Sequence, residues 1–193
     1  MLKICLATNN RHKIEELLPL LGEGIELVTL RDIGCEVDLP ENQDTLQGNA
    51  LEKAQYVWDN FGVSCIADDT GLEVATLDGA PGVYSARYAG PARSDAANVA
   101  LLLQNLANKT NRTAQFRTCI ALILGGEKHF FEGKIEGEIA VAPTGTNGFG
   151  YDPVFVPVGF AETFAQMPLE QKNTMSHRAR ATAKLLDFLK TKV

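Results

Sequence analysis

The chain has 193 residues, of which 45% are hydrophobic and 22% are charged. This composition is typical of folded globular domains and excludes disordered and fibrous proteins. Its 24 acidic and 18 basic side chains give a net charge of −6. An acidic protein repels phosphate backbones at long range, so binding to nucleic-acid polymers and to anionic membranes is disfavoured. A small phosphate ligand carried by a metal ion is not excluded.

The four cysteines, Cys5, Cys35, Cys65 and Cys119, are widely spaced and form no Cys-x-x-Cys pair. All but Cys35 lie in apolar runs, where a free cysteine behaves as a small buried hydrophobe. Residues 1–8 are too short for the apolar core of a signal peptide, and no apolar stretch approaches the roughly 18 residues of a spanning helix. We therefore expect a soluble, cytoplasmic protein.

The first third of the chain alternates apolar runs with segments of helical periodicity. The expected elements are strands at 2–7, 25–30 and 63–67, a helix with Ile14, Leu17, Leu18 and Leu21 at helical spacing that stops at Gly22, and a helix capped by Asp44. In the second helix Gln47 reaches back as in a capping box, and Leu46, Ala50, Ala54 and Val57 share one face. This strand–helix–strand–helix–strand order predicts an α/β layer architecture.

The rest of the chain has a different pattern. The expected elements are a helix at 98–106, strands at 116–124 and 129–139 joined by a turn at 125–128, a Gly/Thr-rich loop at 143–150, a short strand at 154–156 and a helix at 176–190 with Ser176 as its N-cap. A hairpin added to a strand–helix–strand opening predicts a sheet with parallel and antiparallel strands.

The turn Thr8-Asn9-Asn10-Arg11-His12-Lys13 lies between an expected strand and an expected helix. Backbone N–H groups at a helix start, with the helix dipole, form a site for an anion. Thr8 and Asn10 add hydrogen-bonding side chains, and Lys13 adds a positive charge. An ordinary turn capped by Thr8 or Asn10 is the alternative interpretation.

Two adjacent acids, Asp68 and Asp69, follow a buried run and precede Gly71. Carboxylates at the end of a strand are typical of a magnesium site, because magnesium takes one or two carboxylates together with water and phosphate oxygens. Glu41 is a further candidate ligand. The alternatives are an acidic turn ended by Gly71 and a solvated loop acid at 41.

Asn49 and Lys53 are four residues apart and therefore share one face of the second helix. That face borders the apolar stripe. The functional interpretation is a lysine held over a polyanion, and the alternative is a lysine whose stem covers the core while its ammonium reaches solvent.

The segment Gly148-Phe149-Gly150-Tyr151-Asp152-Pro153 has glycines on both sides of an aromatic residue. Such glycines allow close backbone approach and expose the ring of Phe149 for stacking on a base. In the alternative, Phe149 is buried in the core.

Lys172 and the Ser176-His177-Arg178 segment bring cations to the start of the last expected helix. Cations there oppose the helix dipole unless an anion offsets them, which hints at a ligand. Solvated surface positions are the alternative. Taken together, the phosphate turn, the carboxylates, the aromatic loop and these cations describe a metal-assisted nucleotide site.

These motifs, in this order and spacing, resemble the inosine/xanthosine triphosphate pyrophosphatase family from end to end. The matching segments are Thr8–Lys13, Glu41, Asn49–Ala54, Ala67–Leu72, Ala80–Tyr88, Gly148–Pro153, Lys172 and Ser176–Arg178. Thr8 and Thr70 stand where the family often has serine, and Asn9 replaces a frequent glycine.

The resemblance implies one domain over residues 1–193, an α/β protein with an elongated mixed sheet flanked by helices, two lobes and a central active-site cleft. It implies a homodimer that requires Mg²⁺. It also implies hydrolysis of ITP, dITP and XTP to the nucleoside monophosphate and pyrophosphate, which removes deaminated purines from the nucleotide pool.

The resemblance also implies roles for individual residues. Asp69 accepts the proton of the attacking water with Asp68 beside it, and Glu41 and Asp69 hold Mg²⁺. The expected substrate-binding residues are Thr8, Asn9, Asn10, Arg11, His12, Lys13, Lys53, Thr70, Phe149, Gly150, Tyr151, Asp152, Lys172, His177 and Arg178. Among them Phe149 stacks on the base, and His177 and Arg178 recognise its 6-oxo group.

Two other functions remain open from the sequence. One is a pyrophosphatase of similar architecture that acts on modified pyrimidine nucleotides or on dTTP and UTP, as in the septum-inhibitor-like family. The other is a nucleotide-binding regulator without catalysis, which the set Glu41, Asp68 and Asp69 disfavours because a binder does not need paired acids beside phosphate.

Overall fold

The computed structural model describes residues 2–18 and 24–192. The predicted stop of the first helix, Leu21 and Gly22, lies outside the described residues. The chain forms two compact units, each assembled from separate stretches of sequence. The first unit contains residues 1–69, 118–133 and 178–193, and the second contains residues 70–117 and 134–177.

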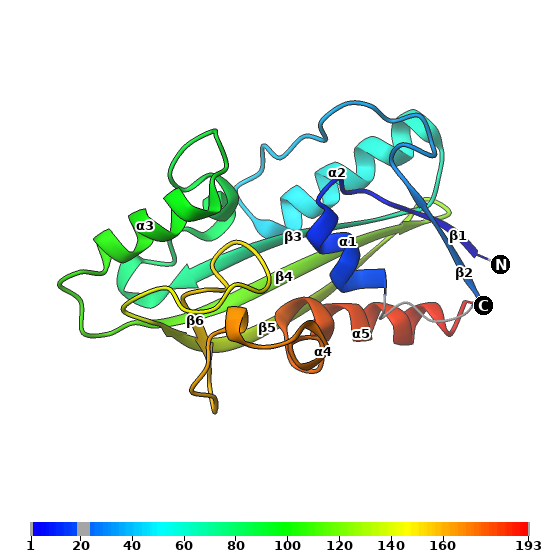
Figure 1. The fold of residues 1–193 in the computed structure, drawn as a ribbon. Helices are drawn as coiled ribbons and strands as arrows, with labels where there is room; N and C mark the ends of the chain where they lie inside the picture. The colour runs from blue at the N-terminus through cyan, green and yellow to red at the C-terminus, as the bar shows by residue number, and fades with distance from the viewer. Residues whose placement is uncertain (1, 19–23, 193) are drawn as a thin grey trace. The chain divides into compact units, whose positions relative to one another are not determined.

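Six strands form one mixed sheet in the order β2-β1-β3-β4-β5-β6 (Figure 1). The strands are β1 (Leu2–Leu6), β2 (Ile25–Thr29), β3 (Cys65–Val74), β4 (Thr113–Leu124), β5 (Glu127–Ile139) and β6 (Phe155–Pro157). β1 pairs in parallel with both β2 and β3, whereas β5 and β6 are antiparallel. The turn at Gly125 and Gly126 joins β4 to β5, as predicted. The expected mixed α/β architecture is confirmed.

Helices cover both faces of the sheet in the first unit (Figure 1). α2 (Leu46–Phe61) packs its apolar face on Cys5, Cys65 and Ala67. The neighbouring strand residues Ile4, Leu6 and Ile66 point to the opposite face. There they meet α1 (Arg11–Leu17) and α5 (His177–Leu189). Successive strand residues therefore serve different helices.

The second unit has its own core, built on the remaining halves of β3, β4 and β5. Phe116, Phe155 and Phe164 pack together in it, with ring centroids 4.7 to 6.2 Å apart. α3 (Asp95–Asn105) adds Val99 and Leu102 to this core. The short elements are the 3₁₀ turns η2 (Ala75–Leu77), η3 (Gly82–Arg87) and η4 (Phe164–Gln166), and the helix α4 (Leu169–Lys172).

Two local expectations were wrong. β3 does not stop at 67 but continues through Asp68, Asp69 and Gly71 to Val74, so the paired acids lie inside a strand and not in a turn. The N-cap of α2 is Thr45, not Asp44, because the Thr45 hydroxyl accepts a hydrogen bond from the N–H of Gly48. The predicted buried face of α2, Leu46, Ala50, Ala54 and Val57, is confirmed.

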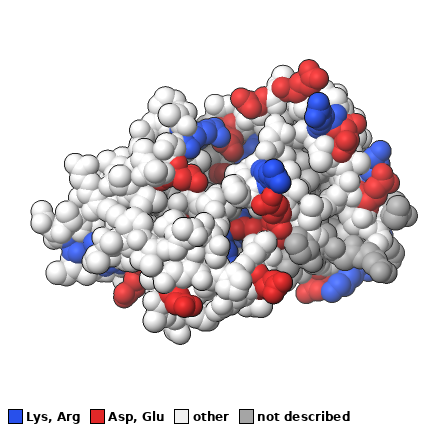
Figure 2. All heavy atoms as spheres, in the orientation of Figure 1, with Lys and Arg blue, Asp and Glu red and all other residues white. Residues whose placement is uncertain are grey.

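All four cysteines are buried with reduced thiols, which confirms the interpretation of Cys5, Cys65 and Cys119 as core residues. Burial raises the pKa of Cys5 and of Cys65 to about 12, so both thiols stay protonated near neutral pH. Within residues 2–18 and 24–192, the helices are all too short or too polar to cross a membrane. Figure 2 shows acidic and basic side chains interspersed on the face that it draws, with no continuous basic area among the described residues there.

Candidate active site

The candidate site begins where β1 ends beside β3. The two strands pair as far as Leu6 and Ile66, and the N–H of Ala7 still donates to the Ile66 carbonyl. β1 ends at Leu6. The next carbonyl along this edge of β3, that of Asp68, therefore accepts from two lysine ammonium groups. Lys53 Nζ lies 2.7 Å from this oxygen and Lys13 Nζ lies 3.3 Å from it. The sheet order reverses between β1 and β3, where open α/β sheets place their ligands.

The turn from Thr8 to Lys13 uses its polar side chains locally. Asn10 is the N-cap of α1, and its Oδ1 accepts from the N–H groups of His12 and Lys13 at 3.0 and 3.4 Å. Thr8 Oγ1 accepts from the N–H of Asn10. Arg11 is exposed and pairs with Glu15, and His12 also lies near Glu15. The capping interpretation of this turn therefore applies in the described structure, and the Lys13 side chain is the part that reaches β3.

The side chain of Asp68 lies among cations from α1 and α5. Its Oδ2 is 3.1 Å from Lys13 Nζ and 3.4 Å from two nitrogens of Arg178. Arg178 also donates to Glu16, and its side chain is only 2% exposed. Burial alone would raise the pKa of Asp68, but Lys13 and Arg178 outweigh it and hold the pKa well below its usual range.

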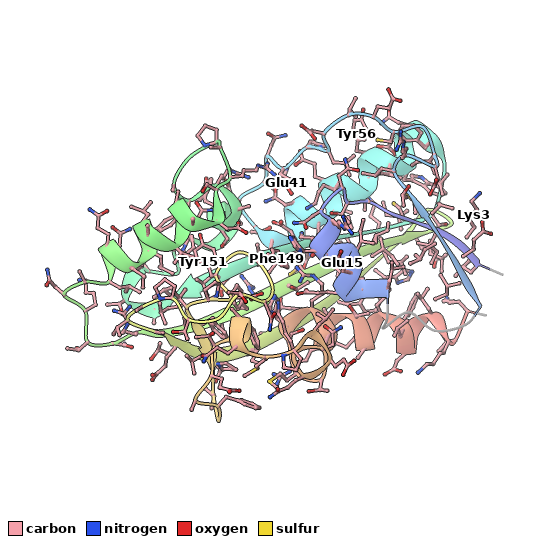
Figure 3. The ribbon with its side chains drawn as sticks, viewed as in Figure 1. Lys3, Glu15, Glu41, Tyr56, Phe149 and Tyr151 are labelled. Atoms are coloured by element: carbon pink, nitrogen blue, oxygen red, sulfur yellow. The ribbon has the colours of Figure 1, made fainter. Side chains whose placement is uncertain are left out.

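Asp69 faces α2 and has a different environment. Its Oδ2 accepts from Asn49 Nδ2 at 3.1 Å, and its Oδ1 lies 3.6 Å from Lys53 Nζ. Glu41, on the segment before α2 (Figure 3), is 2.8 Å from the same ammonium. Burial raises the pKa of Asp69, and Glu41 adds to the rise while Lys53 opposes it. The two adjacent acids therefore have pKa values shifted in opposite directions.

Glu41 and Asp69 are the described side chains that fit a magnesium ion. Both carboxylates approach one ammonium, Lys53 Nζ, so their oxygens converge on a place that suits a cation. Within the described ranges no cluster of three or more His, Cys, Asp or Glu side chains forms a metal cage. Two carboxylates fit magnesium well, because it usually fills its other positions with water and substrate phosphate.

The second unit holds a separate set of predicted residues, which lie on the loop after β5 and, for Lys172, at the end of α4. Lys172 Nζ lies 2.7 Å from Asp152 Oδ2 and 5.4 Å from the centre of the Phe149 ring. The N–H of Phe149 donates to the same Asp152 oxygen at 3.0 Å. Gly148 has a φ of +73°, and a Cβ there would overlap Asp152. The loop thus places an aromatic ring beside a buried lysine–aspartate pair.

The other predicted residues of the second unit have mainly structural contacts. Tyr151 (Figure 3) is buried and its hydroxyl donates to the Ser85 carbonyl. The N–H of Gly150 donates to Asp95. His177 stacks on Phe116 with ring centroids 4.6 Å apart. Thr70 lies half-buried in β3, next to Asp69.

The structure therefore brings Lys13, Lys53, Asp68, Asp69 and Arg178 together around β3, with Glu41 on Lys53. Asn9 is exposed, in the turn between β1 and α1. The Arg178 guanidinium is buried between the carboxylates of Glu16 and Asp68, and its contact with the base stays a prediction.

The sequence predicted no role for Glu16 and no hydrogen-bond partner for Asn49. Glu16 is three residues after Lys13, a spacing that places both on one side of α1. Asn49 was recognised only as a neighbour of Lys53.

Comparison with known proteins decides the family. Residues 4–188 match the family described as the Ham1 family. The chain belongs to the Ham1 family. A dITP/XTP pyrophosphatase of Porphyromonas gingivalis is 56% identical over 190 residues, which cover 98% of each chain. A dITP/XTP pyrophosphatase of Flavobacterium johnsoniae is 50% identical over 188 residues, covering 97% of this chain and 98% of the relative.

Solved structures of Ham1 proteins share the fold. The Ham1 protein of Staphylococcus aureus superposes with a TM-score of 0.91 at 38% identity, covering 99% of this chain and all of that one. A nucleoside-triphosphatase, dITP/XTP pyrophosphatase, of Mycobacterium abscessus gives a TM-score of 0.80 at 44% identity over 96% and 99% of the two chains. The resemblance predicted from the sequence is thereby confirmed.

Proposed function

We propose that this Ham1 chain is a pyrophosphatase that hydrolyses dITP, ITP and XTP to the nucleoside monophosphate and pyrophosphate. In the cell it removes deaminated purines from the nucleotide pool. Relatives named dITP/XTP pyrophosphatase, similar over nearly the whole chain, support this substrate class. The observation that carries the proposal is Asp69, a buried carboxylate of raised pKa that shares the Lys53 ammonium with Glu41.

Asp69 is the general base of the reaction. It takes a proton from the attacking water as the new oxygen–phosphorus bond forms, and the bond between the α- and β-phosphates breaks to release pyrophosphate. A carboxylate whose pKa lies above its usual range is a stronger base once it is ionised. Asp68 holds Lys13 and Arg178 in place and does not exchange protons, because those cations keep it ionised.

Glu41 and Asp69 hold Mg²⁺. The ion, when bound, neutralises negative charge on the triphosphate and polarises its oxygens. Lys13 and Lys53 place two further positive charges at the carboxyl end of β1, and positioning with charge stabilisation is the main task in phosphoryl transfer. Further phosphate contacts are assigned to Thr8, Asn9, Asn10, Arg11, His12, Thr70 and Lys172.

The base is assigned to the loop that carries Phe149. Phe149 stacks on the purine, and Gly150, Tyr151 and Asp152 fix the loop that carries it. His177 donates to the 6-oxo group, which adenine lacks, so that ATP leaves a buried donor unpaired and is rejected. Arg178 is the second residue assigned to the 6-oxo group, and its ion pairs with Glu16 and Asp68 hold its guanidinium in place.

The resemblance also supports a cytoplasmic location and a homodimer. Light scattering of the purified protein is the direct test of the dimer. The central test of function is pyrophosphate release from a panel of nucleotides with and without Mg²⁺. We expect release from dITP, ITP and XTP, a loss of activity with EDTA, and much slower turnover of ATP and GTP. Preferred turnover of dTTP or UTP would contradict the substrate class, and no release from any nucleotide would contradict catalysis.

A further inference from the structure

The side chain of Asn49 lies between the carboxylate of Asp69 and the segment that carries Glu41. It is 1% exposed, on the first turn of α2. Its Oδ1 accepts from the N–H of Gln43 at 2.9 Å, and its Nδ2 donates to Asp69 Oδ2 at 3.1 Å. One buried amide thus connects Asp69 to the backbone of Gln43, two residues after Glu41, through separate atoms.

The chemistry of its partners fixes the orientation of this amide. The backbone N–H of Gln43 can only donate, so the amide oxygen must face it. The amide nitrogen must then face Asp69, and Asp69 Oδ2 must accept. The other oxygen, Oδ1, lies 3.6 Å from Lys53 Nζ, so each oxygen of Asp69 faces a different side chain of α2.

We propose that Asn49 is a positioning residue, which fixes the orientation of the Asp69 carboxylate by holding its Oδ2. This inference rests on the proposed function, in which Asp69 is the base. Asn49 also ties the base to the Glu41 segment through Gln43, so that both acids keep one relative placement. Outer partners that orient such carboxylates typically contribute 10- to 100-fold to activity or metal affinity.

An asparagine with a purely structural role would hold the Gln43 segment in place without affecting the reaction. Substitutions that remove one or both hydrogen bonds of the amide distinguish the structural role from the positioning role. Asn49→Asp keeps an oxygen for the Gln43 N–H but loses the donor to Asp69. Asn49→Leu loses both halves without adding charge. The matched control is Asn98→Asp, because Asn98 is similarly buried, accepts from the N–H of Ala89 and donates to a backbone carbonyl, that of Ala86, where Asn49 donates to a carboxylate.

The kinetic test measures kcat and KM for dITP at saturating Mg²⁺, together with the melting temperature. We expect kcat to fall by about 10- to 100-fold in Asn49→Asp and Asn49→Leu. The KM should stay within about threefold, since the phosphate-binding lysines are retained. Asn98→Asp should lower the melting temperature and leave kcat unchanged. A wild-type kcat in the folded fraction of both Asn49 variants would overturn the proposal.

A second readout does not depend on activity. In the ¹⁵N–¹H spectrum, the side-chain NH₂ of Asn49, identified by its absence in Asn49→Leu, should have one proton shifted downfield by the carboxylate. Asp69→Ala should move that proton upfield. An unmoved resonance would overturn the positioning role even if the protein is an active pyrophosphatase. A wild-type protein that released no pyrophosphate would instead overturn the proposed function, and with it any catalytic use of the hydrogen bond.

Discussion

Asp68 and Asp69 are consecutive residues of β3, yet their side chains bind different helices. Lys13 of α1 and Arg178 of α5 bind Asp68, whereas Asn49 and Lys53 of α2 contact Asp69. Strand alternation explains the split, because neighbouring side chains point to opposite faces of a sheet. The two environments move the pKa values of the two acids in opposite directions, which fits the anchoring role proposed for Asp68 and the base role proposed for Asp69.

Asp68→Asn should destabilise the fold in a way that depends on pH. The folded state lowers the pKa of Asp68 below its ordinary value of 3.8, so its stabilisation is fully present above that pH and is lost as the pH falls further. We expect a loss of about 3–5 kcal/mol at pH 7, since Lys13 and Arg178 lose a buried partner. The difference in melting temperature between variant and wild type should be largest above about pH 4 and should shrink progressively as the pH falls further. Asp59→Asn, at an exposed carboxylate, should change little, and a constant difference from pH 7 to pH 2 would contradict the ion-pair account.

The sequence predicts the periodic elements well because their signals are local. The buried face of α2 follows from apolar residues at helical spacing, and the β4–β5 turn follows from Gly125 and Gly126. Both features need only neighbouring residues. The family motifs also identified Asp69, Lys53 and Glu41 as a group before any contact between them was known.

The environment of the paired acids was not predictable in the same way. Asp68, Asp69 and Gly71 have turn-forming side chains, so a local pattern favours a turn. The strand continues instead because Lys13 and Arg178, 55 and 110 residues away in sequence, neutralise Asp68. The burial of Arg178 between two carboxylates has the same long-range origin.

Lys13→Ala should weaken triphosphate binding more than it slows the chemical step. The Lys13 side chain is 14% exposed and its ammonium is held at β3 by Asp68, so it is placed to meet a phosphate. Losing one hydrogen bond to a charged group should raise the KM for dITP by roughly 10- to 100-fold. Steady-state kinetics measure this, with Lys190→Ala as the control, because Lys190 is exposed and pairs only locally with Asp187. An unchanged KM would remove Lys13 from the phosphate site.

Gly148→Ala should disrupt the aromatic loop of the second unit. The added methyl group would overlap Asp152 and separate it from Lys172. Gly159→Ala is a matched control, since Gly159 also has a positive φ but a methyl group added there would meet no atom within 4 Å. Both variants carry backbone strain of about 1–2 kcal/mol. Gly148→Ala should lose about 2 kcal/mol more in denaturant unfolding, and equal losses would show that the Asp152–Lys172 pair tolerates displacement.

Asp69→Asn should abolish turnover and leave the protein folded. The amide cannot take a proton from water, and loss of a general base typically costs about 10²- to 10⁴-fold in rate. The fold should persist, because Lys53 keeps Glu41 and the Asp68 carbonyl as partners, and Asn49 can still donate to the new amide oxygen. Pyrophosphate release at saturating dITP, with circular dichroism as the check on folding, measures the effect. Asp187→Asn, at an exposed acid paired with Lys190, is the control. Near wild-type release by Asp69→Asn would place the base elsewhere, and the raised pKa of Asp69 would then reflect its burial alone.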